Sequence, residues 1–281
     1  MQHSEVARQW SDAAFYWEKH RAAIDRMFAP VAAALVHDAG IGPGQTVLDV
    51  ATGPGEPALS IAAIVGAGGR VIGVDIVPAM IEAARREAAR RGLGNASFRV
   101  APADELPFDD GSFDAVVSRF GVMFFPSPVD GISEMQRVLA PGGKLAMAVW
   151  HHARDNPFHS VLSDIVARFV EAPPLDPDAP DAFRFAPPGK LLQLAREAGL
   201  ANARERLLRF SIEAPLSLEG FWSVRTEISD KLRTKLAQLS PEQVGEIKRS
   251  FFEAARVYSG ASGLSLPAEV LVVSGQKRGQ A

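Results

Sequence analysis

Apolar and polar residues alternate with two different periodicities along the first half of the chain. From Ser4 to Ala39 the apolar residues return at helical spacing, which predicts two helices. From Thr46 to Trp150 short apolar runs of strand length alternate with longer segments of helical period. Strands that alternate with helices predict crossover units and a parallel sheet covered on both faces. The expected strands are 46–51, 70–75, 97–101, 113–118 and 144–150, and the expected helices are 57–66, 78–92 and 128–140.

The rhythm changes after Trp150, where helical inserts separate the last strands. We interpret these inserts as a lid over the carboxyl ends of the strands. The expected helices are 156–170, 190–199 and most of 217–258, the expected strands are 204–213 and 268–277, and the Pro- and Asp-rich segment 171–189 is expected to be irregular. The sequence therefore predicts a doubly wound, Rossmann-like α/β fold with a seven-stranded, mostly parallel sheet. We divide this one continuous domain into an N-terminal helical cap (1–45), a core (46–150) and the rest of the sheet with its inserts (151–281).

The composition narrows the classes of function. The net charge is −3, which argues against a protein whose main partner is nucleic acid or an anionic membrane. The absence of cysteine excludes disulfides, thiolate nucleophiles and cysteine-based metal sites. The N-terminus lacks the apolar region of a signal peptide, and no apolar run is long enough to span a bilayer. We expect a cytoplasmic protein without nucleic-acid or membrane partners and leave its oligomeric state open, a homodimer included.

The stretch VLDVATGPGEPA carries the first chemical signal, because a strand leads into a glycine turn and then into a helix. Glycines let the backbone approach a ligand closely, and the helix that follows offers unpaired N–H groups. Gly53, Gly55 and Ala58 match the dinucleotide pattern G-x-G-x-x-G/A, which is a weak signal alone. Asp75 ends the second predicted strand, where an acid can accept hydrogen bonds from two ribose hydroxyls. The loop therefore predicts a ligand that contains a nucleoside.

Asp49 separates two kinds of nucleoside ligand. It lies four residues before Gly53 and therefore close to the loop. A carboxylate there would oppose the pyrophosphate of a dinucleotide and would attract a ligand that carries an ammonium group. A mere tight turn is the alternative interpretation of the loop, and the accompanying acids argue against it.

Four motifs occur in a fixed order over residues 46–150. They are the glycine motif with Asp49, Ala51, Gly53 and Gly55, the acid Asp75, the segment PADELPFDDGSFD (102–114) and the phrase LAPGGKL (139–145). Together they resemble the class I S-adenosylmethionine-dependent methyltransferases, of the kind related to ubiquinone and menaquinone biosynthesis enzymes. The resemblance does not cover the C-terminal half.

The resemblance implies S-adenosylmethionine as cofactor and assigns residues to its parts. The loop Gly53–Gly55 with Ala51 would hold the methionine part, with Asp49 near its amino group. Asp75 and Ile76 would hold the ribose side. The adenine would lie along Ala103 and Asp104. Relatives often carry Asp where this chain has Pro102, so the exocyclic amine is left to Asp104 or to no acid, and Asp104 has a simple capping role as its alternative. Ser118 and Arg119, at the end of the fourth strand, would face the methyl-transfer centre.

The histidines and the N-terminal aromatics leave alternatives open. His151 and His152 follow the fifth strand, where one of them is a candidate general base, with a surface loop as the alternative. Together with Asp155 and His159 they also form a weak candidate metal cluster, although we expect no metal. Among the aromatic residues, helical spacing favours core packing for Trp10 and Trp17, whereas the hydroxyl of Tyr16 favours a place in the cofactor pocket.

A basic run, RREAARR (85–91), has two interpretations. It is either a nucleic-acid patch or a solvated helix face with the pairs Glu82–Arg86 and Glu87–Arg91 at i,i+4, and the spacing favours the second.

The acceptor is predicted mainly from absences. The segment after the fourth strand, SRFGVMFFPSP, lacks the Asn/Asp-Pro-Pro-aromatic motif of base-amine methyltransferases, and cytosine C5 chemistry would need a cysteine. Its apolar FGVMFF part favours a small, partly apolar acceptor such as a phenol, a quinone precursor or a polyketide-like molecule. The rival hypotheses are an NAD(P)-dependent oxidoreductase and a non-catalytic ligand-binding protein of the same fold.

Overall fold

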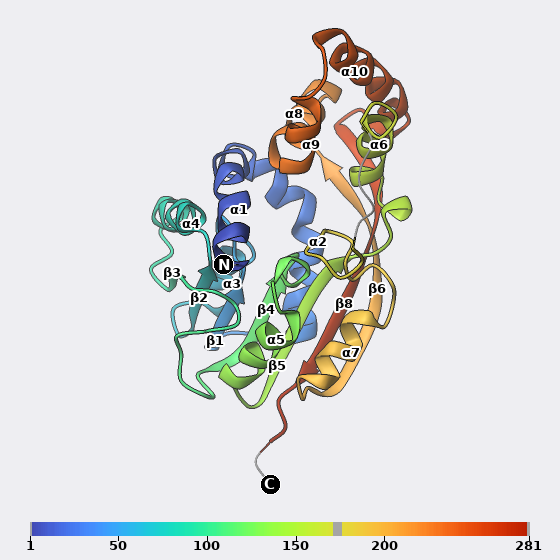
Figure 1. Ribbon diagram of the computed structural model, residues 1–281. Coiled ribbons are helices and arrows are strands. Elements are labelled where there is room, and N and C mark those ends of the chain that lie inside the picture. The colour runs from blue at the N-terminus through green and yellow to red at the C-terminus, as the bar shows by residue number, and fades with distance from the viewer. Residues whose placement is uncertain (1, 171–175, 280–281) are drawn as a thin grey trace.

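The computed structural model describes residues 2–170 and 176–279, and it places one mixed sheet at the centre of the molecule (Figure 1). The strand order is β3-β2-β1-β4-β5-β8-β6, and a two-residue strand, β7, pairs with β8. The strands β1 to β5 are mutually parallel, and β8 runs antiparallel to both β5 and β6. The strands are β1 (Thr46–Val50), β2 (Arg70–Asp75), β3 (Ala96–Val100), β4 (Phe113–Arg119), β5 (Leu139–Trp150), β6 (Ala201–Ala214), β7 (Ser259–Gly260) and β8 (Gly263–Gln276).

Helices cover both faces of this sheet. The helices α2 (Arg21–Ala39), α3 (Ala58–Val65) and α4 (Pro78–Arg91) pack on one face, and α5 (Pro128–Val138) and α7 (Lys190–Glu197) pack on the other. The inner strands are apolar on both faces, which is why they read as near-continuous apolar runs in the sequence. The predicted doubly wound α/β fold with a mostly parallel sheet is confirmed.

The remaining helices gather at the carboxyl ends of the parallel strands, at the top of Figure 1. The helix α1 (Gln2–Lys19) contacts α4, α8 and α9, so that the N-terminal segment reaches the inserts between β6 and β8. Besides α1, the helices at this end of the sheet are α6 (Pro157–Val166), α8 (Leu218–Ile228), α9 (Asp230–Leu236) and α10 (Pro241–Ala255). None of the helices in the described ranges is long and apolar enough to cross a membrane.

Three strands begin several residues before the predicted position, and one of them is β8, which begins at Gly263 rather than at Ala268. The strand β5 begins at Leu139 rather than at Lys144, because the pairing with β4 shifts register across the intervening Pro-Gly-Gly bulge. The strand β6 begins at Ala201 rather than at Arg204, again with a register shift at its start. Residues 176–189 of the predicted irregular segment contain no helix or strand, and residues 171–175 lie outside the described residues.

The arginines of the basic run on α4 form contacts within the helix and with other elements. Glu87 pairs with Arg91 as predicted, at 2.6 Å, but Arg86 pairs with Glu18 of α1 at 2.8 Å rather than with Glu82. The sequence could not show this, because the approach of α1 to α4 is a tertiary contact.

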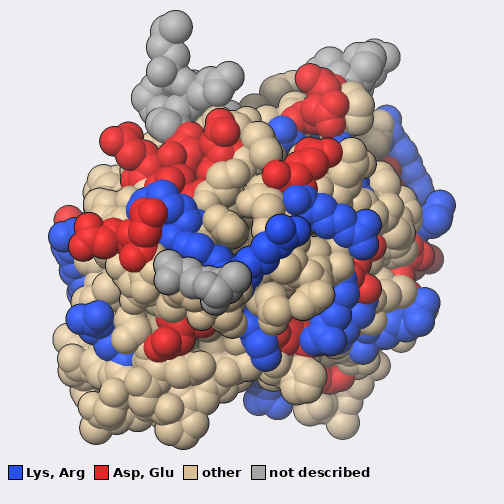
Figure 2. Space-filling view, turned by 90° about the horizontal axis from the view of Figure 1, so that it is seen from below, with Lys and Arg blue, Asp and Glu red and all other residues tan. Residues whose placement is uncertain are grey.

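On the face at the amino ends of the parallel strands, Figure 2 shows a band of basic side chains with acidic side chains on either side of it.

Candidate functional site

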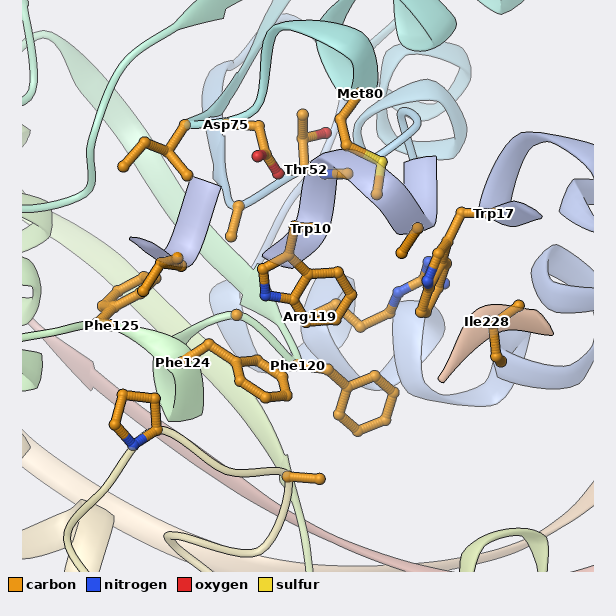
Figure 3. Close-up of a pocket in the computed structure, with 18 of the residues that line it drawn as sticks. Trp10, Trp17, Thr52, Asp75, Met80, Arg119, Phe120, Phe124, Phe125 and Ile228 are labelled. Atoms are coloured by element: carbon orange, nitrogen blue, oxygen red, sulfur yellow. Dashed lines mark hydrogen bonds between the residues drawn. The ribbon is translucent and has the colours of Figure 1, made fainter. Parts of the chain in front are cut away.

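A cavity of about 360 Å³ lies at the carboxyl ends of β1, β2 and β4. The strand order reverses between β1 and β4, and in open α/β sheets ligands bind at such a switch point. The walls of the cavity are mostly apolar and aromatic, with few polar groups, which is typical of a small-molecule site. Figure 3 shows the indole of Trp10 between Asp75 and Phe124. Of the residues predicted from the sequence, the cavity is lined by Ala51, Gly53, Asp75, Ile76, Ala103, Asp104 and Arg119.

The glycine loop has the backbone conformation that its sequence predicts. The φ values of Ala51, Gly53 and Gly55 are 58°, 55° and 119°. They lie in or near the left-handed region, which residues other than glycine rarely adopt. A Cβ on Gly55 would come within 2.7 Å of Leu59 Cδ1, so the loop can pack on α3 only with glycine there. Gly53 lines the cavity, and Gly55 supports the loop from behind.

Asp75 fixes this loop to the end of β2. Its carboxylate accepts hydrogen bonds from the N–H groups of Gly53 and Val77, both at 2.9 Å. Burial raises the pKa of Asp75 to about 6, against the lowering effect of these N–H groups. Each carboxylate oxygen has a second lone pair, so both can still accept from a ligand hydroxyl.

Asp49 lies behind the loop and does not line the cavity. Its side chain is fully buried, and one oxygen accepts hydrogen bonds from Thr52 Oγ1 at 2.6 Å and from Ala58 N at 3.1 Å. The other oxygen, Oδ1, is buried without a hydrogen-bond partner among the described residues. Burial raises the pKa of Asp49 to about 7. Asp49 thus holds the loop to the start of α3, and a contact with a ligand amino group stays a prediction.

Charged side chains on the two neighbouring helices hold the other side of the loop. Arg21 of α2 donates to the carbonyl oxygens of Pro54 and Ala83, and so joins the loop to α4. Arg91 of α4 pairs with Glu56 at 2.6 Å and with Asp25 at 3.0 Å. The loop is therefore fixed before any ligand arrives.

Arg91→Met is expected to lower the free energy of unfolding by about 2 kcal/mol, because it leaves Glu56 and Asp25 close together without their cation. The measurement is urea unfolding at neutral pH. Arg90→Met is the matched control, since the Arg90 side chain is 71% exposed and pairs only with Glu87 in the described chain. Equal losses in the two variants would contradict a bracing role for Arg91.

Arg119 and Ser118, at the end of β4, take different positions. Arg119 lines the cavity, and burial lowers its pKa while the charges of Glu56, Asp25 and Asp49 oppose the lowering. Ser118 is fully buried and does not line the cavity, so the structure does not bring it together with the other predicted site residues. Successive strand residues point to opposite faces, so only one of the two can face the cavity.

Trp10 and Trp17 of α1 pack against buried hydrophobic residues, as predicted, and they also face the cavity. The ring of Trp10 lies 5.0 Å from that of Phe124. Tyr16 does not line the cavity but packs against Phe15 and under the guanidinium of Arg233. The i, i+7 spacing that predicted core packing for the tryptophans also turns them toward the cavity, and Tyr16 lies off that face.

The two histidines predicted as candidate bases, His151 and His152, do not line the cavity. The backbone of His151 bonds to β8, and its Nδ1 lies 2.9 Å from Glu269 Oε2. The histidine that does line the cavity is His159, on α6. A signal for it was present in the sequence, since it lies three residues before Leu162 and seven before Val166, on the buried face of an amphipathic helix.

The group of possible metal ligands in the structure differs from the cluster predicted from the sequence. His151 and Asp155 come together with Glu269, whereas His159 lies in the cavity wall. Arg209 pairs with Glu269 at 2.8 Å, and Arg154 approaches Asp155. These two guanidinium groups already balance the carboxylates, which favours an ion-pair cluster over a metal site.

Known proteins match this chain in both sequence and fold. A family profile described as a methyltransferase domain matches residues 47–143. Aklanonic acid methyltransferase DauC from Streptomyces sp. is 35% identical over 150 residues, which cover 52% of this chain and 67% of that protein. Ubiquinone/menaquinone biosynthesis C-methyltransferase UbiE from Geobacter sp. is 42% identical over 113 residues, which cover 40% of this chain and 48% of that protein. A putative methyltransferase structure from Bacillus halodurans has a TM-score of 0.56 at 21% identity, with 88% of this chain and 98% of that chain covered.

The chain therefore belongs to the class I S-adenosylmethionine-dependent methyltransferases, as the sequence motifs predicted. The cofactor of the family, S-adenosylmethionine, is the one expected from the motifs. The chain spans about half the length of the first curated relatives that it matches, and the matched region includes the glycine loop and the Pro-Gly-Gly phrase.

Proposed function

We propose that this protein transfers a methyl group from S-adenosylmethionine to an oxygen or carbon atom of a small, partly apolar acceptor. The observation that carries the proposal is one cavity that joins a nucleoside-type site, at Asp75 and Gly53, to a region walled by aromatic rings. The two curated relatives described above are named as a C-methyltransferase of ubiquinone/menaquinone biosynthesis and as an aklanonic acid methyltransferase, and these names support a small organic acceptor.

The residues at the cavity fit the cofactor. The carboxylate of Asp75 faces the cavity with free lone pairs for two ribose hydroxyls. Ile76, Ala103 and Met80 offer apolar surface for an adenine ring, and Asp104 offers a carboxylate beside it. The orphaned Oδ1 of Asp49 and the left-handed loop match a ligand part that carries an ammonium group. When bound, S-adenosylmethionine supplies an electrophilic methyl group on a sulfonium ion.

The chain's own part in the reaction is positioning and exclusion of water. Phe120 and Trp150 stack with ring centroids 4.4 Å apart, and both line the cavity, where an aromatic acceptor can pack against them. Holding two reactants in line at about 3–3.5 Å accounts for much of the rate of such a transfer. Trp10, Trp17 and Ile228 add large apolar side chains to the wall of the cavity, which limits the access of water.

His159 replaces the predicted histidines as the candidate to interact with an acceptor hydroxyl. Burial, with the nearby charge of Arg225, lowers the pKa of His159 well below its ordinary value, so the ring is neutral at physiological pH. His159→Gln is expected to lower turnover by roughly a hundred-fold, at the low end of general acid–base contributions, and more than His151→Gln does. The measurement is the rate of S-adenosylhomocysteine release with a working acceptor. A larger fall for His151→Gln would restore the assignment made from the sequence.

The experiment that tests the function is a titration followed by a screen. Purified protein is titrated calorimetrically with S-adenosylmethionine, S-adenosylhomocysteine and NAD⁺, and then incubated with S-adenosylmethionine and a panel of phenols, quinols and aromatic polyketides. We expect both sulfur ligands to bind and S-adenosylhomocysteine to form with a member of the panel. Binding of NAD⁺ alone would favour the oxidoreductase alternative. Binding of the sulfur ligands without turnover on any acceptor class would favour a non-catalytic ligand-binding protein.

A further inference from the structure

Arg225 occupies an unusual position for an arginine. It lies in the middle of α8, on the same face as the buried side chains of Phe221 and Ile228. Only 4% of the residue is exposed, and it lines the cavity. Its guanidinium carbon lies 4.3 Å from the centre of the Phe158 ring. Long cationic side chains normally carry their charge to water, and this one carries it into the wall of a mostly apolar cavity.

No carboxylate among the described residues forms an ion pair with Arg225, and its buried Nε has no hydrogen-bond partner there. The other cations of the cavity are balanced. Arg119 lies in the field of Glu56 and two aspartates, and Lys231 pairs with Asp181 at 2.6 Å. Burial alone lowers the pKa of Arg225 to about 9, with no acid to oppose it. An unbalanced buried charge is costly for the fold, so its presence calls for a partner outside the described chain.

His159 provides a second unsatisfied polar atom on the neighbouring helix. Its Nε2 is buried without a hydrogen-bond partner in the described structure, and its ring packs edge-on against Phe158 and Trp150. It lines the same cavity as Arg225, and the charge of Arg225 acts on it. Two independent buried groups at one end of an aromatic cavity thus lack partners.

We propose that Arg225 and His159 form an oxyanion subsite, and that the natural acceptor is an aromatic molecule with an ionised oxygen, a carboxylate or a phenolate. This inference rests on the proposed methyl-transfer function and names its substrate class. The guanidinium of Arg225 donates to the oxyanion, and His159 hydrogen-bonds to the same group or to a neighbouring hydroxyl. The aromatic rings of Phe158, Phe120 and Trp150 contact the flat part of the acceptor.

The test compares a charged probe with its neutral isostere. 2-Naphthoate and 2-naphthamide are titrated calorimetrically into wild-type protein, Arg225→Met, Arg225→Lys and the control Lys248→Met. Lys248 is a cation of the same helical insert, and it lies outside the cavity and pairs with Glu219. We expect wild type and Lys248→Met to prefer naphthoate by at least ten-fold, Arg225→Met to lose this preference and Arg225→Lys to keep part of it. 4-Nitrophenolate, titrated at about pH 8, separates a phenolate site from a carboxylate site.

Two further measurements distinguish a failure of the oxyanion subsite from a failure of the proposed function. Arg225→Met is expected to raise the melting temperature, because it removes an unbalanced buried charge, whereas a merely structural arginine would give a lower melting temperature on replacement. S-adenosylhomocysteine is titrated into every variant, and its failure to bind wild type would overturn the proposed function. Retained cofactor binding with equal affinity for naphthoate and naphthamide, or a preference that survives in Arg225→Met, would overturn the oxyanion subsite alone.

Discussion

Asp75→Asn is expected to weaken the binding of S-adenosylmethionine by roughly a hundred-fold or more. Both oxygens of Asp75 already accept from backbone N–H groups, of Gly53 and of Val77. An asparagine must turn its NH₂ group toward one of these donors, so the substitution places a donor against a donor and also removes the charge that strengthens bonds to ribose hydroxyls. A lost charge-assisted hydrogen bond costs about 1.5–3 kcal/mol, and the misplaced donor adds to this cost.

The measurement is calorimetric titration with S-adenosylmethionine and S-adenosylhomocysteine, with Asp164→Asn as the control. Asp164 lies on the exposed face of α6, away from the cavity. Unchanged affinity in Asp75→Asn would contradict the assignment of Asp75 to the ribose. Loss of affinity in both variants would point to a general effect of charge.

The same carboxylate gives the binding a pH dependence. Burial raises the pKa of Asp75 to about 6, and ligand hydroxyls bond best to the ionised form. Binding therefore requires the loss of a proton below this pH, so affinity rises with pH and is about ten-fold lower at one unit below the pKa. Titrations in two buffers of different ionisation enthalpy detect the released proton. The step near pH 6 is expected to be absent from Asp75→Asn, and any contribution of Asp49 near pH 7 remains there.

The core of the fold could be predicted because its signals are local. A short apolar run, a glycine turn and an amphipathic helix repeat along 46–150, and each strand was found within a few residues of its observed position. Gly53 and Asp75 were found for the same reason, since a parallel sheet brings the carboxyl ends of its strands to one edge. Their hydrogen bond of 2.9 Å also depends on the left-handed conformation of the glycine loop.

The acceptor side of the site could not be predicted in this way. His159 and Arg225 come from helices that lie far apart in the sequence, and only packing brings them to one cavity. His151 directly follows a strand at the expected edge, but its ring turns toward Glu269 on β8. The signal for Arg225 is a charge on the apolar face of a helix, between Phe221 and Ile228, and it has meaning only once that face is known to be buried.

Asp49→Asn is expected to have two effects of opposite sign, because the charge of Asp49 destabilises the fold in the absence of ligand. Burial raises its pKa from 3.8 to about 7, so between these values the folded state binds more protons than the unfolded state. The stability of the ligand-free protein therefore falls as pH rises from about 4 to about 7. Asparagine keeps an oxygen for Thr52 Oγ1 and Ala58 N and removes the charge. Each unit of pKa shift corresponds to about 1.4 kcal/mol, so the gain above pH 7 is a few kcal/mol.

Urea unfolding at about pH 4 and about pH 8 measures this effect, and Asp38→Asn is the matched control. Asp38 is also buried, but hydrogen bonds from Arg206 and His37 prevail over burial and lower its pKa, so its replacement is expected to destabilise the protein at neutral pH. Asp49→Asn is also expected to weaken S-adenosylmethionine binding, because the ligand's ammonium group loses a nearby negative charge. A variant that is less stable at about pH 8 yet binds the cofactor normally would show that Asp49 only holds the loop. A variant that gains stability and loses affinity would show that the fold keeps a costly buried charge for a cationic ligand.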